Sequence, residues 1–320
     1  MKIVVLDGRP LAPERADWAI LEDLGELEVY PHTPPELLRE RSAGAEVLVT
    51  NKARIGAEIL GARPGPRLIA LTATGYDCVD VATARRLGIP VSNVPEYSTP
   101  SVAQYVFALL LELCHQTARH GAAVQAGEWT SQPDFSIRRA RLVELEGKTM
   151  GIVGFGRIGR RVGRLAEALG MRVIHHGRTR PESGPDAESW RVLNDLLAES
   201  DVISLHCPMS PETAGLINRD RLALLKPTAF LINTARGPLV NEADLAAALV
   251  EGRLAGAALD VVSAEPIRVD NPLLHAPNCL ITPHIAWATD EARERLMKAT
   301  AANIAAFLAG RPINVVNPAG

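Results

Sequence analysis

Residues 149–177, TMGIVGFGRIGRRVGRLAEALGMRVIHHG, decide the fold of this chain. The stretch begins with an apolar run and passes through a glycine-rich turn. It then alternates polar and apolar residues at helical spacing as far as Gly170, where a second apolar run begins. This order predicts a strand, a tight turn, an amphipathic helix and a second strand, which together form one βαβ unit of a parallel sheet.

The turn has the spacing G-x-G-x-x-G, formed by Gly154, Gly156 and Gly159. The first glycine allows a tight turn, the second lets the backbone approach a pyrophosphate, and the third permits close packing of the helix. The free N–H groups at the helix N-terminus then face the phosphates. A strand-to-helix turn without a ligand is the alternative. The pattern predicts a dinucleotide site that comprises Gly154, Phe155, Gly156, Arg157, Ile158 and Gly159.

The end of the second strand favours one coenzyme. A fold of this type usually places an acidic residue there, which bonds the ribose hydroxyls and repels a 2′-phosphate. This chain has Gly177, Arg178, Thr179 and Arg180 instead. The two guanidinium groups and the hydroxyl suit a phosphate, so we expect NADP(H). NAD(H), bound without an acidic anchor beside a solvated basic loop, is the alternative.

The rest of the chain repeats this architecture in two series. Short apolar runs alternate with helical stretches, such as the one at residues 14–25, and the second series begins at Thr149. Residues 99–127 are expected to form one long helix, and a final helix follows from about residue 287. We therefore predict an α/β protein with two Rossmann-like or flavodoxin-like domains, parallel sheets and a cleft between them.

The predicted domain boundaries follow from the second sheet, which is self-contained. Residues 100–285 are expected to form the dinucleotide-binding domain. The final helix then returns to the first domain, so that residues 1–99 and 286–320 form a discontinuous substrate-binding domain.

Composition limits the partners of the chain. Its 320 residues carry a net charge of -3, from 34 basic and 37 acidic residues, which gives no reason to expect a nucleic-acid partner. No apolar run approaches the roughly 20 residues that span a bilayer, and the N-terminus enters a strand without a leader. The four cysteines are far apart and fit no metal-ligand spacing, so we expect no metal and a reducing, cytoplasmic location.

Three late strands each precede a chemically capable side chain. AFLINTAR ends in Arg236, GAALDVVSAE in Glu265 and CLITPH in His284. Ligands of open α/β sheets bind at the carboxyl ends of the strands, so all three side chains are expected at the rim that holds the glycine-rich turn. Considered alone, each residue has an ordinary alternative: a surface charge for the arginine, a turn residue for the glutamate and a packing role for the histidine.

Together these residues suit reduction of a ketone. Hydride transfer leaves negative charge on the oxygen, and a histidine can donate the proton. A carboxylate bonded to the other ring nitrogen fixes the tautomer and favours the imidazolium. An arginine can hold a substrate carboxylate and polarise the carbonyl. We therefore predict that Arg236 binds and polarises, Glu265 tunes the histidine, and His284 gives the proton.

Over essentially its whole length the chain resembles the D-isomer-specific 2-hydroxyacid dehydrogenase family. The resemblance is carried by TATGYDCVD, STPSVAQYVFALLL, ELEGKTMGIVGFGRIGRRV, LHCPMSPETAGLIN, LLKPTAFLINTARGPLVNEADLAAAL, GAALDVVSAEP and NCLITPHIAWAT. It implies that Arg236, Glu265 and His284 are the catalytic set. It also implies a split substrate domain and a homodimer formed largely through the coenzyme domain.

Further site residues follow from the resemblance alone. Backbone amides of Thr74 and Gly75 would receive the substrate carboxylate. Other residues would contact the coenzyme, with His206, Cys207, Pro208 and Thr213 near the adenosine and Thr234, Ala235 and Asp260 near the nicotinamide. Many relatives carry a glutamate where this chain has Gln104.

Two details point to a subgroup. Trp287 follows His284 by three residues, and Lys52 lies at the end of a strand, as in members that resemble glyoxylate and hydroxypyruvate reductases. A tryptophan at the mouth of the pocket favours small 2-keto acids. We expect NADPH-dependent reduction of glyoxylate and hydroxypyruvate. Alternatives are a packing tryptophan, a surface lysine, a phosphoglycerate-type dehydrogenase that uses NAD, or a nucleotide-sensing corepressor.

Overall fold

The computed structural model describes residues 1–11 and 18–318 and divides into two compact units. Unit 1 comprises residues 1–98 and 288–320, and unit 2 comprises residues 99–287. Each unit contains one sheet in which the strands pair in parallel. The predicted α/β class with two parallel sheets is confirmed.

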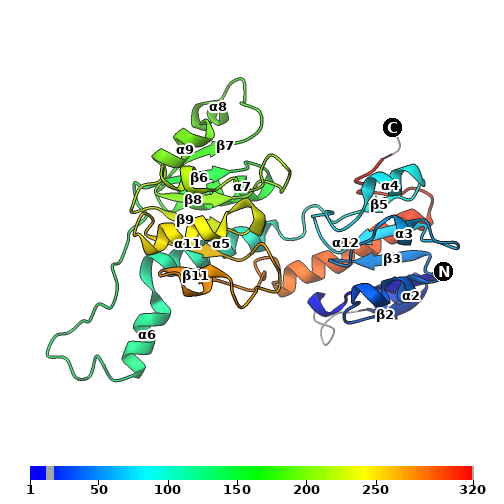
Figure 1. Cartoon of the computed structure of the whole chain (residues 1–320), viewed down its shortest axis with the longest axis horizontal. Helices are drawn as coiled ribbons and strands as arrows, with labels where there is room; N and C mark the ends of the chain where they lie inside the picture. The colour runs from blue at the N-terminus through cyan, green and yellow to red at the C-terminus, as the bar shows by residue number, and fades with distance from the viewer. Residues whose placement is uncertain (12–17, 319–320) are drawn as a thin grey trace. The chain divides into compact units, whose positions relative to one another are not determined.

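The sheet of unit 1 has the strand order β2-β1-β3-β4-β5, which is the flavodoxin-like order (Figure 1). Its strands are β1 (Lys2–Val5), β2 (Glu26–Val29), β3 (Val47–Thr50), β4 (Leu68–Leu71) and β5 (Val91–Ser92). Its helices are η1 (Arg9–Leu11), α1 (Ala19–Glu22), η2 (Pro35–Leu37), α2 (Leu38–Ser42), α3 (Ala57–Leu60), α4 (Val81–Arg86) and α12 (Asp290–Leu308). Part of the helix predicted at residues 14–25 falls on residues 12–17, which lie outside the described residues.

Burial on both faces explains the apolar strands of unit 1. All residues of β3 and β4 are buried, as expected for parallel strands covered by helices on both sides. The last helix, α12, packs against β4 and α1. It begins at Asp290, slightly later than predicted, because the Thr289 hydroxyl oxygen caps it by accepting a hydrogen bond from Ala292 N at 3.2 Å.

The sheet of unit 2 has the order β11-β10-β9-β8-β6-β7. Its strands are β6 (Thr149–Val153), β7 (Arg172–His176), β8 (Val202–Leu205), β9 (Phe230–Asn233), β10 (Gly256–Leu259) and β11 (Cys279–Ile281). Its helices are α5 (Thr99–His115), α6 (Thr117–Gln125), α7 (Arg157–Ala168), α8 (Pro185–Ser189), α9 (Leu193–Glu199), α10 (Arg219–Leu222), η3 (Gly237–Leu239), α11 (Glu242–Val250) and η4 (Pro272–His275). The order in which strands are added reverses at β6, because β7 lies on one side of β6 and β8 on the other. Such folds bind ligands at this point, between β6 and β8.

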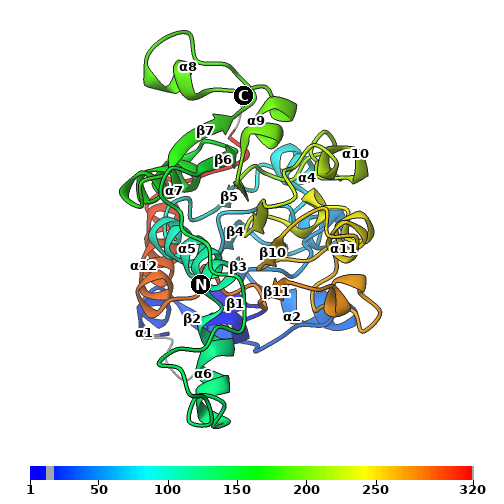
Figure 2. The same cartoon turned by 90° about the vertical axis from the view of Figure 1, so that its left-hand side faces the viewer.

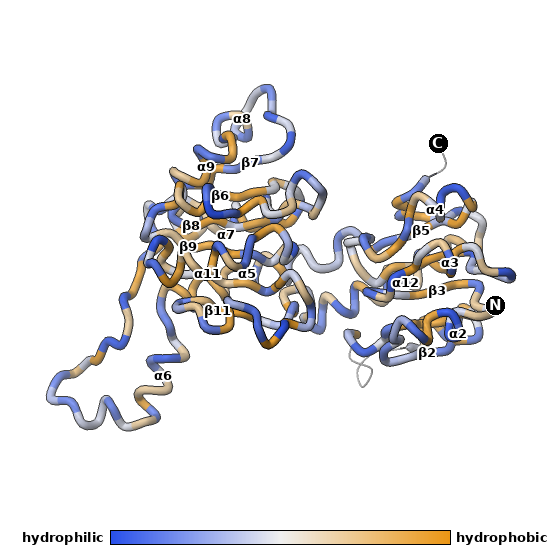
Figure 3. The backbone as a smooth tube through the Cα atoms, viewed as in Figure 1, coloured by the Kyte–Doolittle hydropathy of each residue, from blue (hydrophilic) through white to orange (hydrophobic). Residues whose placement is uncertain are grey.

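Alternate residues of each strand in unit 2 enter different cores. Phe230 and Ile232 of β9 pack with α5 and α7 on one face, whereas Leu231 packs with α9 and α11 on the other. The period of two follows from the pleat of the strand. Figure 3 shows the resulting band of hydrophobic residues along the strands. Both faces are covered, so functional side chains lie at the strand ends.

The long helix predicted at residues 99–127 is wrong in one respect, because it breaks at Gln116. This residue has φ +46° and separates α5 from α6. The buried face of α5 ends at Cys114, and Ala123 is the one buried residue of α6. Helical stability comes mainly from packing of an apolar face, so nothing holds α6 in line with α5.

Two segments project from the body of unit 2. Figures 1 and 2 both show α6 extending on one side and α8 lying beyond the edge strand β7 on the other. Among the described residues, no helix is both long and apolar enough to cross a membrane. The four cysteines are free thiols.

Candidate active site

The glycine-rich turn sits at the point where the sheet of unit 2 reverses. Gly154 follows β6 with φ +96°, a conformation that favours glycine. A Cβ atom there would lie 2.5 Å from both Cys207 N and the carbonyl carbon of His206, which follow the neighbouring strand β8. The turn therefore needs glycine both for its dihedral angles and for contact with the next strand end.

Gly156 and Gly159 differ in the space around them, and each arrangement suits a bound pyrophosphate. Gly156 is exposed, and a Cβ added there would have no heavy atom within 4 Å. A Cβ at Gly159 would lie 2.3 Å from the carbonyl oxygen of Gly154, so α7 packs directly on the turn. Open space lies above the turn at the N-terminus of α7, and these residues fit a dinucleotide phosphate group.

The segment after β7 is open and basic. A Cβ at Gly177 would meet nothing within 4 Å, and Arg178, Thr179 and Arg180 are exposed. The guanidinium carbon of Arg180 lies 5.6 Å from the centroid of the Trp190 ring, a cation–π distance. The sequence reasoning did not single out this tryptophan.

The segment after β8 forms a polar turn of its own. The ring of His206 contacts the Ser204 hydroxyl through Nε2 at 2.8 Å, and burial lowers the pKa of His206 to about 4. Burial also raises the pKa of the Cys207 thiol to about 11. Both side chains are therefore neutral at physiological pH. The Thr213 hydroxyl donates to the carbonyl of Pro208 at 2.9 Å and so closes the following loop.

The segment after β9 is organised by Asn233. Its Oδ1 accepts from Ala235 N at 3.0 Å, and its Nδ2 donates to the carbonyl of Arg236 at 2.8 Å. Arg236 donates from one guanidinium nitrogen to the carbonyl of Ala235. The hydroxyl oxygen of Thr234 is buried and has no hydrogen-bond partner among the described residues. An orphaned buried hydroxyl is unusual, and it fits a site that takes a polar ligand.

His284 and Glu265 are in direct contact. Nδ1 of the histidine lies 2.7 Å from Oε2 of the glutamate, and the two side chains are 25% and 32% exposed. The other carboxylate oxygen accepts from Val262 N at 3.4 Å. A carboxylate at Nδ1 leaves Nε2 as the nitrogen available to a reactant. The pair has the geometry of an oriented proton donor.

A buried carboxylate holds the backbone around His284. Asp260 follows β10 and is 1% exposed. Its oxygens accept from the Thr282 hydroxyl at 2.6 Å, from Ile285 N at 2.9 Å and from Ala286 N at 2.8 Å. Burial raises the pKa of the Asp260 carboxyl, and these three donors oppose that rise. The bonds enclose His284, whose φ of +56° is uncommon for a residue with a side chain.

Close backbone packing brings the Arg236 segment to the Glu265 segment. A Cβ added to Gly237 would lie 1.9 Å from the carbonyl carbon of Val262 and 2.4 Å from Ser263 N. The strands β9, β10 and β11 are neighbours in register, with Leu259 aligned to both Asn233 and Ile281. The predicted residues Arg236, Glu265 and His284 therefore follow three adjacent strands at one edge of the sheet.

The predicted substrate residues of unit 1 are held by buried polar side chains. The Asp7 carboxylate accepts hydrogen bonds from Thr50 Oγ1 and from the backbone amides of Asn51, Lys52 and Ala53, at 2.6 to 3.0 Å. This fixes the backbone of Lys52 after β3.

A similar arrangement holds the loop after β4. The Asn93 side chain donates to the carbonyl of Thr74 at 2.7 Å, and the Thr74 hydroxyl donates to the carbonyl of Val94 at 2.8 Å. Gly75 follows in the same loop and is partly exposed, as is Trp287 in unit 2.

Several positioning residues were missed by the sequence reasoning, namely Asp7, Asn93, Asn233 and Thr282. Each is a short polar residue at or near a strand end, and this placement is the only signal the sequence offers. Such residues favour local backbone hydrogen bonds, but many loops contain them. Their partners cannot be identified before the loops are placed.

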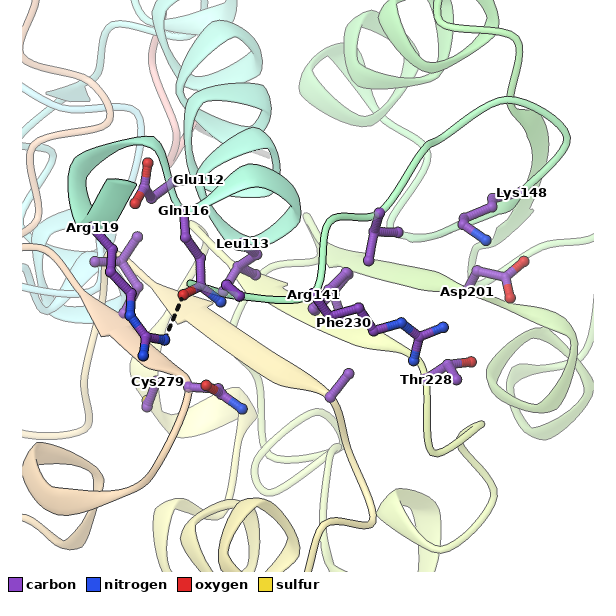
Figure 4. Close-up of a pocket in the computed structure, with 15 residues that line it drawn as sticks. Glu112, Leu113, Gln116, Arg119, Arg141, Lys148, Asp201, Thr228, Phe230 and Cys279 are labelled. Atoms are coloured by element: carbon purple, nitrogen blue, oxygen red, sulfur yellow. Dashed lines mark hydrogen bonds between the residues drawn. The ribbon is translucent and has the colours of Figure 1, made fainter. Parts of the chain in front are cut away.

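A separate cavity of about 490 Å³ lies at the opposite edge of the sheet in unit 2 (Figure 4). Lys148, Asp201 and Thr228 line it just before β6, β8 and β9 begin. On the side of the cavity near α6, the Arg119 guanidinium donates a hydrogen bond to the Gln116 side-chain oxygen. Because it lies at the amino ends of the strands, this cavity is distinct from the predicted coenzyme site.

Comparison with known proteins agrees with this geometry. Residues 107–286 match the family model for the NAD binding domain of D-isomer specific 2-hydroxyacid dehydrogenases. The chain is 47% identical to a hydroxypyruvate reductase of Blautia hydrogenotrophica, over 99% of this chain and 100% of the relative.

Solved structures share the fold over the whole chain. The protein TT0316 of Thermus thermophilus is 38% identical with a TM-score of 0.87, covering 99% of this chain and 100% of that one. An NADPH-dependent glyoxylate/hydroxypyruvate reductase of Sinorhizobium meliloti, in complex with citrate, is 29% identical with a TM-score of 0.84, covering 99% and 98%.

Replacing Gly237 by alanine is expected to displace the loops that carry Arg236 and Glu265, because the new methyl group meets backbone atoms that cannot rotate away. We expect a loss of about 1–3 kcal/mol in the free energy of unfolding, measured by urea denaturation. Gly121→Ala on α6, where a Cβ meets nothing within 4 Å, is the control and should leave stability unchanged or higher. Equal stability of the two variants would contradict the close packing described.

Proposed function

Because this chain belongs to the D-isomer specific 2-hydroxyacid dehydrogenase family, we propose that it reduces glyoxylate to glycolate and hydroxypyruvate to D-glycerate, with NADPH as the coenzyme. The nicotinamide coenzyme supplies the hydride. The single observation that carries the proposal is the contact between His284 and Glu265, because it provides an oriented proton donor at the same end of the sheet as the proposed coenzyme turn.

His284 is the proposed proton donor. Glu265 occupies Nδ1, so the proton moves from Nε2 to the carbonyl oxygen as the hydride reaches the carbonyl carbon. The ketone thereby becomes an alcohol, and the ring is left neutral. In the reverse direction the neutral ring accepts the alcohol proton. Positioned general acid catalysis of this kind contributes on the order of 10²–10⁴-fold to the rate.

Arg236 is the proposed substrate anchor. Its guanidinium can form paired hydrogen bonds to the substrate carboxylate, and its charge polarises the adjacent carbonyl. Asn233 supports this role, because its amide fixes the backbone on both sides of the arginine side chain. On the substrate side we further propose contacts from Lys52, Thr74, Gly75 and Trp287.

The coenzyme contacts are proposed in three groups. Residues 154–159 take the pyrophosphate. His206, Cys207, Pro208 and Thr213 flank the adenosine, and Thr234, Ala235 and Asp260 line the nicotinamide side. Preference for NADPH is supported by the open space at Gly177, by the exposed Arg178 and Arg180, and by the Sinorhizobium meliloti relative, which is NADPH-dependent by its name.

Steady-state kinetics with both coenzymes and a panel of 2-keto acids test the proposal. We expect glyoxylate and hydroxypyruvate to give the highest kcat/KM, and NADPH to exceed NADH by at least about tenfold, as one to two charge-assisted bonds to a phosphate provide. Faster reduction of branched or aromatic keto acids would refute the small pocket. A tenfold preference for NADH would refute the assignment of the basic loop.

Replacing His284 by alanine is expected to lower kcat for reduction by about 10²–10⁴-fold, because the proton donor is lost. Coenzyme affinity, measured by fluorescence titration, should be unchanged, since the glycine-rich turn is intact. His275→Ala provides a matched control at a histidine of η4 and should leave kcat unchanged. Parallel loss of coenzyme binding and turnover in His284→Ala would indicate a structural role instead.

We also propose that the protein is a homodimer. The segment that projects with α6 exposes Trp129, Phe135 and Leu142, at 47%, 91% and 48%. Apolar side chains gathered on one projecting segment are typical of an interaction surface. Sedimentation equilibrium should give twice the chain mass of 34.4 kDa, and Phe135→Asp should shift the mass toward the monomer. A monomeric wild-type protein would exclude the dimer.

A further inference from the structure

Four side chains form a continuous cluster behind the glycine-rich turn of unit 2. We call this cluster the Arg160 clamp, and it consists of Phe155, Arg160, His175 and Asp186. Its members come from the turn itself, from α7, from β7 and from the first turn of α8. The sequence predicted none of the contacts within this cluster.

The first part of the clamp is a pair of contacts made by the Phe155 ring. The rings of Phe155 and His175 lie 4.0 Å apart between centroids with an interplanar angle of 8°. The guanidinium carbon of Arg160 lies 4.7 Å from the Phe155 centroid, at cation–π distance. Phe155 is the residue between the first two glycines, so the stack ties the turn to β7 and α7.

The second part of the clamp reaches α8. His175 is 3% exposed, and its Nε2 donates to the backbone carbonyl of Asp186 at 3.0 Å. A carbonyl only accepts, so the proton sits on Nε2 and the other nitrogen, Nδ1, is unprotonated in the neutral ring. Burial lowers the pKa of His175, so the neutral form persists at physiological pH.

Arg160 closes the clamp by an ion pair. Its guanidinium lies 2.7 Å from the Asp186 carboxylate, and this partner holds the pKa of that carboxyl below its usual value. Arg160 therefore contacts both the aromatic ring of the turn and the acid of α8. Because its planar guanidinium can stack and bond in different directions, one side chain serves both contacts.

The clamp connects two parts of the proposed coenzyme site. Phe155 belongs to the turn proposed for the pyrophosphate, and Asp186 lies two residues after the segment 177–184, which carries Arg178 and Arg180. That segment is thus anchored at β7 by His175 and at α8 by Asp186. A misplacement of about 1 Å can lower the rate at a well-oriented site by up to about 10²-fold. Anchoring of the basic segment therefore affects the specificity for the coenzyme.

We infer that the Arg160 clamp is a specificity-determining positioning element, which sets where the basic segment 177–184 lies relative to the pyrophosphate turn. The inference rests on the proposed preference for NADPH. The clamp side chains act through Arg178 and Arg180, which contact the 2′-phosphate. Loss of the clamp therefore weakens recognition of the 2′-phosphate and leaves the shared part of the coenzyme bound as before.

The test compares two ligands that differ only in the 2′-phosphate, adenosine 2′,5′-bisphosphate and 5′-AMP. Isothermal titration of the full chain gives the ratio of their affinities. We expect the wild-type protein to favour the bisphosphate by at least about tenfold, and Arg178→Ala with Arg180→Ala to abolish this ratio. Arg160→Gln should lower the ratio at least about fivefold with 5′-AMP affinity unchanged.

Two further variants separate positioning from simple charge. Arg164→Gln removes the same charge one turn along α7 at an exposed position and should leave the ratio unchanged. His175→Leu removes a neutral ring, so it alters no charge, yet it breaks both the stack and the bond to Asp186. It should lower the ratio as Arg160→Gln does. If His175→Leu does not fold, as judged by circular dichroism, His175→Met, which also lacks a ring and a hydrogen-bond donor, replaces it with the same expected result.

Each outcome has a distinct meaning. A wild-type protein without preference for the bisphosphate refutes the proposed coenzyme and this inference together. A preference that is present in the wild type but unchanged in Arg160→Gln and His175→Leu refutes the clamp alone. A ratio lowered by Arg160→Gln but not by the histidine variants overturns positioning, because Arg160 then acts only through its charge. Equal weakening of both ligands overturns it in favour of a structural role.

Discussion

The candidate active site depends on the buried carboxylate of Asp260. It accepts three hydrogen bonds from the segment on both sides of His284, from a position at the end of the neighbouring strand. A buried carboxylate is costly unless it is fully hydrogen-bonded, so the donors and the acceptor hold one another in place. This mutual constraint maintains the left-handed backbone of His284 and turns its ring toward Glu265.

Backbone contacts between glycines and neighbouring strand ends provide the second constraint. Gly154 touches the segment after β8, and Gly237 touches the segment that leads to Glu265. In both places two loops approach more closely than any side chain would allow. The parallel sheet makes this possible, because it brings all its carboxyl ends to one edge. The proposed coenzyme-binding and catalytic residues therefore lie on loops that are irregular but closely packed.

Charge is used sparingly around this edge. Burial keeps three groups neutral, because it lowers the pKa of the histidines His206 and His175 and raises the pKa of the Cys207 thiol. Cationic groups remain where a phosphate or carboxylate is proposed to bind, and Arg160 is paired with Asp186. A ligand with several negative charges then meets few competing ions of its own sign. This distribution explains how a chain of net charge -3 can offer a basic binding surface.

The sequence by itself determined the parallel α/β class, the strands, the glycine-rich turn and the candidate residues after three strands. Those features are local, since apolar periodicity and glycine spacing are set by residues a few positions apart. The break at Gln116 was missed because a polar stretch with good helix formers does not reveal that its packing face has ended. The contact between His284 and Glu265 was predicted from the chemistry of the two side chains. Only the tertiary structure decided that Asp260 holds the loop and that Phe155, Arg160, His175 and Asp186 join. These contacts link residues 5 to 26 positions apart in the chain, and most of them form only after the sheet has brought its strands side by side.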